Sequence, residues 1–562
     1  MRDQAASGWT SVELKGRTLR WGVTGAVGLA ALVAVGLWLR LHQLAAEGFA
    51  DDEVHKWLAA HRYLTGQFGG DDLEHPMLMK SLIALCIALL PSSWAPETLT
   101  RIPNALAGGA TIWAVAQLGR RLFGRAAGLL AAAAGAVCTT YVGYQRVAKE
   151  DTLFGLFLLL LFWCVAEAKA AAGDGRDQDR KRWELWGAGA LGAMLASKYY
   201  VFFALFPLLA WWTLRGAPGE WRLPVRRWVQ LIAVAFVVWA ALNWTPFLPE
   251  AWPYLGDHLA GRHVETPSLF FMGRVYENVP LRLATGMPPS FFFVLPAVKL
   301  TPPLFSAALA GIAIALVRRR PAHRLMLVWV GFWYFVWLLS GGKYARFFLS
   351  VLPAFLLFAS HAVAVVTTAT ARACARALAL VPPALRRPIA PVTLLAISVP
   401  FGAAALLVGC EARAAFELAP HERLYLSPRA GGAHGVEWFF PHCDYFDAGL
   451  REAVAYIAAH AEGPAEIVSE APLPVQLYAA RSGRADLVAT RSIGDASCGA
   501  GRLCYVLVQP GRVYLHNQAA VERLAAREPW HVELIRGAPA VKVYRFEAGE
   551  LPFAAKATVG AR

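Results

Sequence analysis

Long apolar runs follow one another from residue 21 to residue 409, and they restrict the chain to one class of fold. Each run holds roughly 18 to 22 apolar residues, enough for a helix to cross a hydrocarbon core of about 30 Å. The chain of 562 residues is 57% hydrophobic and only 17% charged, whereas soluble domains carry about a quarter charged residues. The sequence therefore predicts a mainly α-helical, polytopic membrane protein.

Basic residues gather in short clusters that set the topology of these runs. The clusters lie at residues 15–20, 120–125, 176–182, 215–227, 318–324 and 372–387. Lys and Arg are enriched in cytoplasmic loops, so all of these clusters, together with residues 1–20, are placed in the cytoplasm. The same pattern accounts for the net charge of +15, which is therefore not taken as a sign of nucleic-acid binding.

Three apolar runs lie between the first two clusters, although an even number of crossings must separate them. The shortest, 77–94, is therefore predicted to be a juxtamembrane or re-entrant helix. The first run, 21–41, is long enough to be retained as a signal anchor. Lys198 divides 184–214 into two helices. About eleven crossings result, at 21–41, 101–119, 126–143, 151–169, 184–197, 199–214, 228–245, 291–317, 324–340, 347–366 and 389–409.

This topology brings charged residues from several segments to the non-cytoplasmic side, beginning with the acidic triplet of the outer loop 42–100. The set is Asp51, Asp52, Glu53, His55, Glu74, His75, Lys80, Arg101, Arg146, Glu150, Asp151, Lys198, Lys343 and Arg346. A single charge at a membrane edge often only anchors a helix end, and Asp51 is expected to cap a helix that starts there. Acids and bases that converge at one depth instead predict a functional site.

The mixture of carboxylates and cations favours group transfer from a lipid phosphate to an alcohol. The cations would bind the phosphate, and a carboxylate would take the proton of the attacking hydroxyl. A transporter or flippase is the alternative from another class. We find no internal repeat of the kind that transporters commonly show, and the charges collect at one face. A non-catalytic scaffold is the weakest alternative.

Several segments resemble the protein O-mannosyltransferase family and the wider polyprenyl-phosphate-sugar transferases of the GT-C fold, including the lipid A aminoarabinose transferases. The segments are "DDEVHKWLAAHRYLTGQF", "EHPMLMKSL", "TRIPNALAGG", "YQRVAKEDTLF", "SKYY" and "GGKYARFFLSVLP". The resemblance covers most of the chain in order. It implies a bacterial inner-membrane enzyme whose active site and C-terminal domain face the periplasm.

The resemblance also implies roles for individual residues. Asp52 would be the catalytic base, with Glu53 supporting it, and Lys80, Arg101 and Arg346 would lie near the lipid phosphate. Further substrate contacts are expected from His55, His75, Arg146, Asp151, Lys198 and Lys343. The sequence departs from the family at Leu73 and Met77, and the outer loop 246–290 is too short for the β-trefoil domain of eukaryotic members.

The implied donor is a polyprenyl-phosphate sugar, with mannose as the first candidate. The acceptor is left open between Ser or Thr of an exported protein and a glycolipid or envelope glycan. The partners are thus the lipid-linked sugar, the acceptor and membrane lipid, without nucleic acid. A divalent cation on Asp51, Asp52, Glu53 and Asp151 is chemically reasonable, but nearby Lys and Arg can neutralise phosphate without one.

Residues 410–562 change to a mixed composition and predict a small extracytoplasmic α/β domain after the membrane domain 21–409. "FDAGLREAVAYIAAHA" has helical periodicity, with Asp447 as the expected cap. "AEIVSE", "CYVLVQP" and "VKVYRF" are expected to be strands. In an oxidising compartment, Cys498 and Cys504 form the simplest of the disulfides open to Cys410, Cys443, Cys498 and Cys504.

Overall fold

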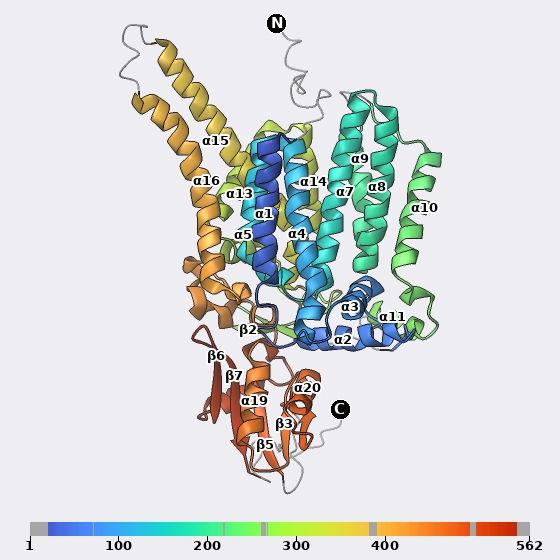
Figure 1. Ribbon diagram of the computed structural model, residues 1–562, viewed down its shortest axis with the longest axis vertical. Coiled ribbons are helices and arrows are strands. Elements are labelled where there is room, and N and C mark those ends of the chain that lie inside the picture. Colours follow the sequence, from blue (N-terminus) through green and yellow to red (C-terminus); the bar gives the residue numbers. More distant parts are fainter. Residues whose placement is uncertain are drawn as a thin grey trace.

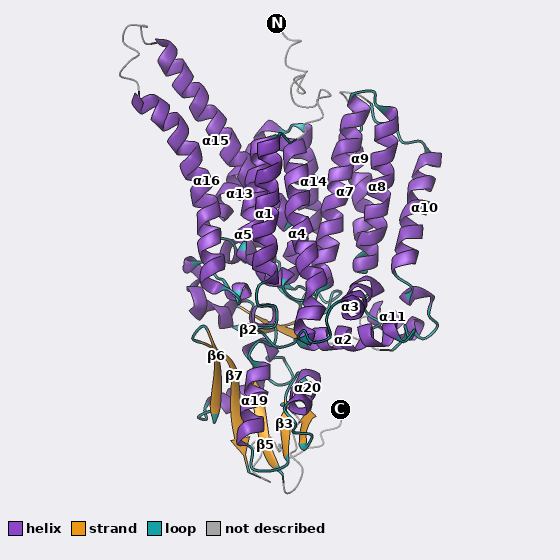
Figure 2. Cartoon of the chain, viewed as in Figure 1, coloured by secondary structure: helices purple, strands orange, loops and turns teal. Residues whose placement is uncertain are grey.

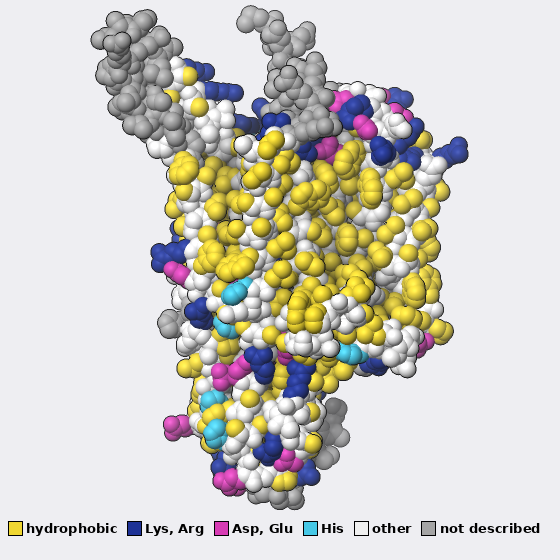
Figure 3. All heavy atoms as spheres, viewed as in Figure 1, with side chains coloured by type: hydrophobic (Ala, Val, Ile, Leu, Met, Phe, Trp, Pro, Cys, Tyr) yellow, Lys and Arg dark blue, Asp and Glu magenta, His cyan; other side chains and the backbone are white. Residues whose placement is uncertain are grey.

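A helix bundle makes up the larger part of the molecule, and a small sheet domain lies at one end of it (Figure 1). The computed structural model describes residues 21–70, 72–216, 220–259, 266, 268–380, 390–494 and 502–547. Figure 3 shows apolar side chains along the sides of the bundle, with Lys and Arg gathered at the end opposite to the sheet domain. This is the distribution that the positive-inside pattern predicts.

The bundle is built from helices that run nearly side by side (Figure 2). They are α1 (Val23–Leu41), α4 (Pro96–Phe123), α5 (Arg125–Val137), α6 (Thr139–Gln145), α7 (Glu150–Gly173), α8 (Asp177–Ser197), α9 (Phe206–Leu214), α10 (Val225–Leu242), α13 (Pro302–Arg318), α14 (Pro321–Leu338), α15 (Leu352–Leu380) and α16 (Ala390–Leu418). Among the described residues, α1, α7, α10 and most of α15 pass as membrane spans by length and apolarity, and α5 with α6 is a further candidate bent by 56°. The number of crossings predicted above is therefore not confirmed.

Short elements lie across the end of the bundle that faces the sheet domain. They are α2 (Asp51–Leu64), α3 (Met77–Leu89), α11 (Ala251–Leu259) and the hairpin of β1 (Ser268–Phe271) and β2 (Arg274–Glu277). The 13 residues of α3 measure only about 20 Å, and Figure 1 places α3 beside α2 rather than among the long helices. This placement supports the juxtamembrane interpretation of 77–94.

The predicted single span 291–317 is wrong, because the chain breaks into α12 (Phe291–Lys299) and α13. Pro302 has no N–H and occupies the first turn of α13, where that loss costs no helical hydrogen bond. Buried Glu411 on α16 accepts the Thr301 N–H at 3.0 Å. It also accepts the Thr139 N–H at 3.1 Å, where α5 bends into α6.

The predicted break at Lys198 is confirmed, since α8 ends at Ser197 and α9 follows a short 3₁₀ turn.

The C-terminal region contains a five-stranded sheet in the order β4-β3-β5-β7-β6, together with several short helices. The strands are β3 (Ala465–Val468), β4 (Leu487–Thr490), β5 (Leu503–Val508), β6 (His531–Ile535) and β7 (Ala538–Phe546), and the helices are α17 (Val436–Phe439), α18 (Pro441–Tyr445), α19 (Leu450–His460), α20 (Pro472–Arg481) and α21 (Gln518–Ala525). All three predicted strands are confirmed. Because α16 continues to Leu418, residues 410–418 belong to a bundle helix rather than to this domain.

Two predicted details of the C-terminal region have different outcomes. Asp447 does not cap α19 with its side chain, because Gly449, at φ 87°, occupies the N-cap. The Asp447 carboxylate instead accepts hydrogen bonds from Asp51, Gln509 and Arg512. Cys504 is disulfide-bonded, while Cys410 and Cys443 are free thiols. Cys498 lies outside the described residues.

Candidate active site

Asp52 lies in the first turn of α2, and its carboxylate forms an ion pair with the Lys149 ammonium. Lys149 is the N-cap residue of α7. The Asp52 side chain is 26% exposed while that of Lys149 is 5% exposed. Asp52 is thus a carboxylate that substrate can reach, held at the start of α2 by a buried cation.

Glu53, the next residue, is completely buried and has a structural partner. Its carboxylate accepts from Arg101 Nε and Nη2 at 2.9 and 2.6 Å, and from the Ala148 N–H at 2.9 Å. It also accepts the Ala50 N–H at 3.1 Å. Ala50 is the N-cap residue of α2, so the Glu53 carboxylate binds a backbone N–H at the helix start. The expected cap by Asp51 is therefore wrong.

All three guanidinium nitrogens of Arg101 donate hydrogen bonds to groups of the protein itself. Besides Glu53, it donates to the carbonyls of Leu44, Glu47 and Gly48 at 2.6–2.9 Å. An arginine has five N–H groups, and these contacts account for all of them. Arg101 therefore positions the chain that leads into α2, and nothing remains on it to donate to a phosphate.

Replacing Glu53 by glutamine is expected to destabilise the protein by about 3–5 kcal/mol, because the Arg101 charge is then buried without its partner. Thermal unfolding of the purified protein in detergent measures this loss. Asp177→Asn is the control, since Asp177 pairs with Arg180 at an exposed position, and its unfolding temperature should not change. An unchanged unfolding temperature for Glu53→Gln would contradict the structural role.

A second charged cluster begins at Lys56, one helical turn after Asp52 on α2. Lys56 Nζ lies 3.1 Å from Glu150 Oε1 and 3.8 Å from Asp72 Oδ2, and His75 Nδ1 lies 2.6 Å from Asp72 Oδ1. Burial alone would lower the pKa of His75, but Glu150 and Asp72 outweigh it and raise the pKa to about 10. His75 is thus a cation at neutral pH and does not serve as a base.

This cluster also holds the group of side chains best arranged for a metal among the described residues. The ligand atoms of Asp72, His75 and Glu150 lie within 4.8 Å of one another. The Lys56 ammonium already lies against both carboxylates, and Lys80 Nζ is 3.7 Å from Asp72. A divalent ion would meet these two cations, so we assign no metal. The four acids proposed from the sequence each lie against Lys or Arg instead.

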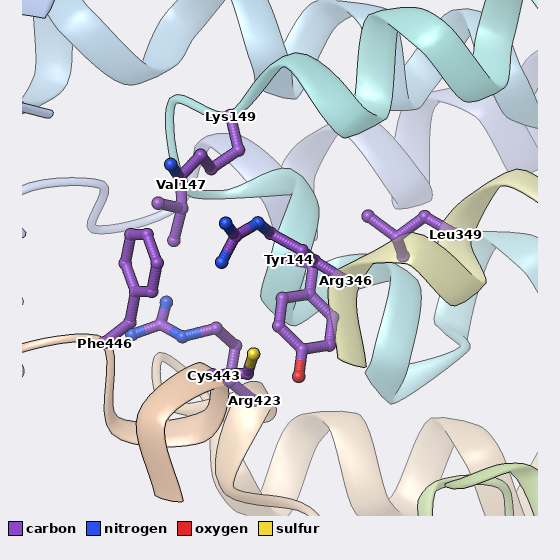
Figure 4. Close-up of a pocket in the computed structure, with 8 residues that line it drawn as sticks. All are labelled: Tyr144, Val147, Lys149, Arg346, Leu349, Arg423, Cys443 and Phe446. Atoms are coloured by element: carbon purple, nitrogen blue, oxygen red, sulfur yellow. The ribbon is translucent and has the colours of Figure 1, made fainter. Parts of the chain in front are cut away.

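A small pocket with three cations is shown in Figure 4, and one of these cations is Lys149, the partner of Asp52. Lys149, Arg346 and Arg423 line it together with Tyr144, Val147, Leu349, Cys443 and Phe446. Within the described part of the chain, buried Arg346 Nη1 has no hydrogen-bond partner, and Nε lies 3.3 Å from Asp151 Oδ2 without a hydrogen bond. Arg423 is held by the Tyr445 carbonyl at 3.2 Å and by the Glu47 carboxylate. The pocket thus presents donors that an anion would satisfy.

Lys149 has an unusual pKa for a lysine. Burial, followed by the nearby charges of Arg346 and Lys198, lowers it to about 7 although Asp52 lies against the ammonium. Asp151 connects the other two cations, because it accepts from Lys198 Nζ at 2.6 Å and faces Arg346. The structure therefore joins Asp52, Lys149, Arg346, Asp151 and Lys198 in one network.

The other residues predicted from the sequence support loops or lie at the margin. Lys80 donates to the carbonyls of Asp72 and His75, Arg146 to those of Leu39 and Gln43, and Lys343 to those of Met287 and Ser340. His55 lies on α2, three residues after Asp52, with a half-buried side chain. Lys80 and Arg101, expected near a lipid phosphate, instead hold backbone carbonyls.

Sequence reasoning missed Lys149, Arg423 and Lys56, and it placed Glu150 in the outer charged set without assigning it a role. Lys149 carried a local signal, since it stands between Arg146 and Asp151 immediately before an apolar helix. Arg423 had none, because it follows α16 and reaches the pocket only through the tertiary fold.

Two comparisons with known proteins bear on the family and the fold of this chain. A model of the family described as dolichyl-phosphate-mannose-protein mannosyltransferase matches residues 74–244. ArnT from Cupriavidus metallidurans bound to undecaprenyl phosphate is similar at a TM-score of 0.50 and 15% identity, over 93% of this chain and 98% of that one. The chain has the GT-C glycosyltransferase fold. The same ArnT in the apo state gives a TM-score of 0.51 and 14% identity, over 92% and 97% of the two chains.

The family match and the GT-C fold confirm the resemblance that the sequence motifs indicated. The matched range contains Lys149, Asp151 and Lys198 but begins after Asp52. A search of curated protein sequences finds no match to this chain.

Proposed function

We propose that this protein transfers a sugar from a polyprenyl-phosphate donor to a hydroxyl acceptor at the outer face of a bacterial inner membrane. The observation that carries the proposal is the cationic pocket next to Asp52, in which Arg346 still has unpaired donors. A lipid phosphate is an anion of suitable charge and position for such donors. That a protein of the same fold was solved with undecaprenyl phosphate bound supports this choice of donor.

The reaction requires one displacement at the anomeric carbon. The acceptor oxygen forms a bond to that carbon while the bond from the carbon to the phosphate oxygen breaks. Asp52 takes the proton of the acceptor hydroxyl. The polyprenyl phosphate leaves with the electron pair, and Lys149 and Arg346 stabilise the charge that develops on it.

The ion pair between Lys149 and Asp52 gives this mechanism an order of events. In the structure, the Lys149 ammonium lies against the proposed base. A donor phosphate that enters the pocket competes for the same ammonium. Binding of the donor would then release the Asp52 carboxylate for the acceptor hydroxyl, so that the base becomes available when the sugar is in place.

The pKa of Lys149 predicts a pH dependence for donor capture. With a pKa of about 7, the ammonium is charged below this value and loses its charge as the pH rises through it. We expect kcat/KM for the donor to fall above pH 7, approaching tenfold per unit, because kcat/KM reports the pKa values of the free enzyme.

A Lys149→Arg variant tests the assignment, since a guanidinium stays charged across this range. Its alkaline decline in kcat/KM should disappear or move beyond pH 9. If the variant declines at the same pH as the wild type, a group other than Lys149 controls donor capture.

For the acceptor, we propose Ser or Thr hydroxyls of exported proteins, with mannose as the first sugar to test, because the matching family model has this description. A glycolipid or envelope glycan is the second candidate, supported by the short outer loop 246–290, which leaves no room for an added acceptor-binding domain. A transporter is less consistent with the site, since the charged network lies at one end of the bundle beside α2.

The test supplies purified protein with a radiolabelled polyprenyl-phosphate sugar and a mixed envelope extract. Label in the peptide fraction that alkaline β-elimination releases would support the protein acceptor, whereas label in the lipid or glycan fraction would support the second candidate. Labelled sugar carried across the bilayer of proteoliposomes, without any transfer, would overturn the enzyme proposal in favour of a transporter.

A further inference from the structure

The segment that leads into α2 is held by side chains from the C-terminal domain. Arg451 on α19 donates to the carbonyls of Ala45 and Ala46 at 2.8 and 2.7 Å. The Tyr478 hydroxyl on α20 accepts the Phe49 N–H at 2.5 Å and donates to Glu97 at 2.7 Å. Residues far apart in the sequence thus fix the backbone immediately before Asp52, the proposed base.

Asp447 completes these contacts at the first residue of α2. Its buried carboxylate accepts the Asp51 N–H at 3.1 Å, next in the chain to Asp52. Arg512 binds the same carboxylate through Nε at 2.8 Å and through Nη2, and Gln509 donates to it at 3.0 Å. This connected arrangement explains why Asp447 is not used as a helix cap.

Gly48 shows how closely the two parts of the chain approach. A Cβ atom at this position would lie 2.8 Å from Arg451 Cβ and 3.1 Å from the Tyr478 hydroxyl. The segment and the domain therefore pack backbone against side chain, with no space for a residue larger than glycine.

We propose that Asp447, Arg451, Tyr478 and Arg512, which we call the clamp, position Asp52 for proton transfer. The inference rests on the proposed function and gives the C-terminal domain a positioning role, in addition to the lining that Cys443 and Phe446 contribute to the pocket. The clamp residues do not touch the reacting atoms, so they are positioning residues. A displacement of Asp52 by about 1 Å can cost a hundredfold in rate. The proposed phosphate contacts of Lys149 and Arg346 come from other elements, so loss of the clamp should lower kcat more than it changes donor binding.

Asp447→Asn tests the clamp, with Asp486→Asn as the matched control. Asp486 also pairs with an arginine through two contacts of 2.8 Å, but its partner Arg484 otherwise donates only to carbonyls of the same domain. We expect kcat per donor-binding site to fall about 10- to 100-fold in Asp447→Asn, with the donor KM within about twofold of wild type. Asp486→Asn should keep both values. Counting sites by bound polyprenyl phosphate removes any effect of unfolded protein.

Hydrogen–deuterium exchange of peptides covering residues 44–54 gives a measurement that needs no activity. Exchange there should increase in Asp447→Asn and not in Asp486→Asn. Tyr478→Phe, which removes one hydroxyl, should give smaller changes in the same directions if Asp447→Asn fails to fold. Unchanged exchange, or increased exchange with unchanged kcat, would overturn the clamp. Absence of sugar transfer by the wild type would instead overturn the proposed function, while exchange still reports on the clamp.

Discussion

Replacing Asp52 by asparagine is expected to lower the rate of sugar transfer by about 10²- to 10⁴-fold, the range that general-base catalysis contributes. The amide keeps the size of the side chain but cannot accept the proton of the acceptor hydroxyl. The loss should appear in kcat, measured as labelled sugar transferred per minute by the purified variant.

Donor binding distinguishes this explanation from a general loss of structure. Because Asp52 competes with the donor phosphate for the Lys149 ammonium, the asparagine variant should bind polyprenyl phosphate at least as tightly as the wild type. Asp52→Glu retains a carboxylate and should recover part of the rate. Full activity of Asp52→Asn would show that this residue is not the base, and a loss of donor binding together with kcat would indicate a structural role.

Replacing Arg346 by glutamine is expected to weaken donor binding by roughly 10- to 100-fold, since hydrogen bonds to charged groups contribute about 1.5–3 kcal/mol each. Arg346 lines the pocket with Nη1 unpaired, and its Nε lies 3.3 Å from Asp151 Oδ2. A decrease in kcat should accompany the change in affinity, because the charge on the leaving phosphate grows in the transition state. Titration with polyprenyl phosphate measures the affinity directly.

Arg346→Lys is the matched variant, because it keeps the charge and removes the planar fork. Its affinity should lie between those of the wild type and Arg346→Gln. Equal affinities for all three proteins would place the phosphate elsewhere, and Lys80 and Arg101 would then have to be reconsidered.

The bundle and the position of α2 could be predicted from the sequence because their signals are local. Apolar runs, basic clusters and the acidic triplet at 51–53 are each contained in a short stretch. Pro302 was also a local signal, because proline favours a helix start. The apolar run 291–317 is long enough for one span, so the helix break at this proline was not predicted. Helix breaks inside a bundle are tolerated when another side chain satisfies the freed backbone groups, and Glu411 does so here.

The partition of charges between chemistry and structure could not be predicted in the same way. Arg101 and Arg346 look alike in the sequence, but Arg101 is saturated by Glu53 and three carbonyls whereas Arg346 keeps unpaired donors. The difference depends on backbone carbonyls that only the tertiary fold brings into contact. Asp447 is a similar case, because its partners Asp51 and Arg512 are distant in sequence.

In the proposed reaction, this chain couples the release of a lipid phosphate to glycosylation of a hydroxyl near Asp52. The most direct measurement follows the released polyprenyl phosphate and the transferred sugar in one reaction of the purified wild-type protein. With an acceptor present, we expect equal amounts of both products from the wild type, and formation of both about 10²- to 10⁴-fold more slowly with Asp52→Asn. Sugar transfer that Asp52→Asn performs as fast as the wild type, or transfer without release of polyprenyl phosphate, would contradict the proposed reaction.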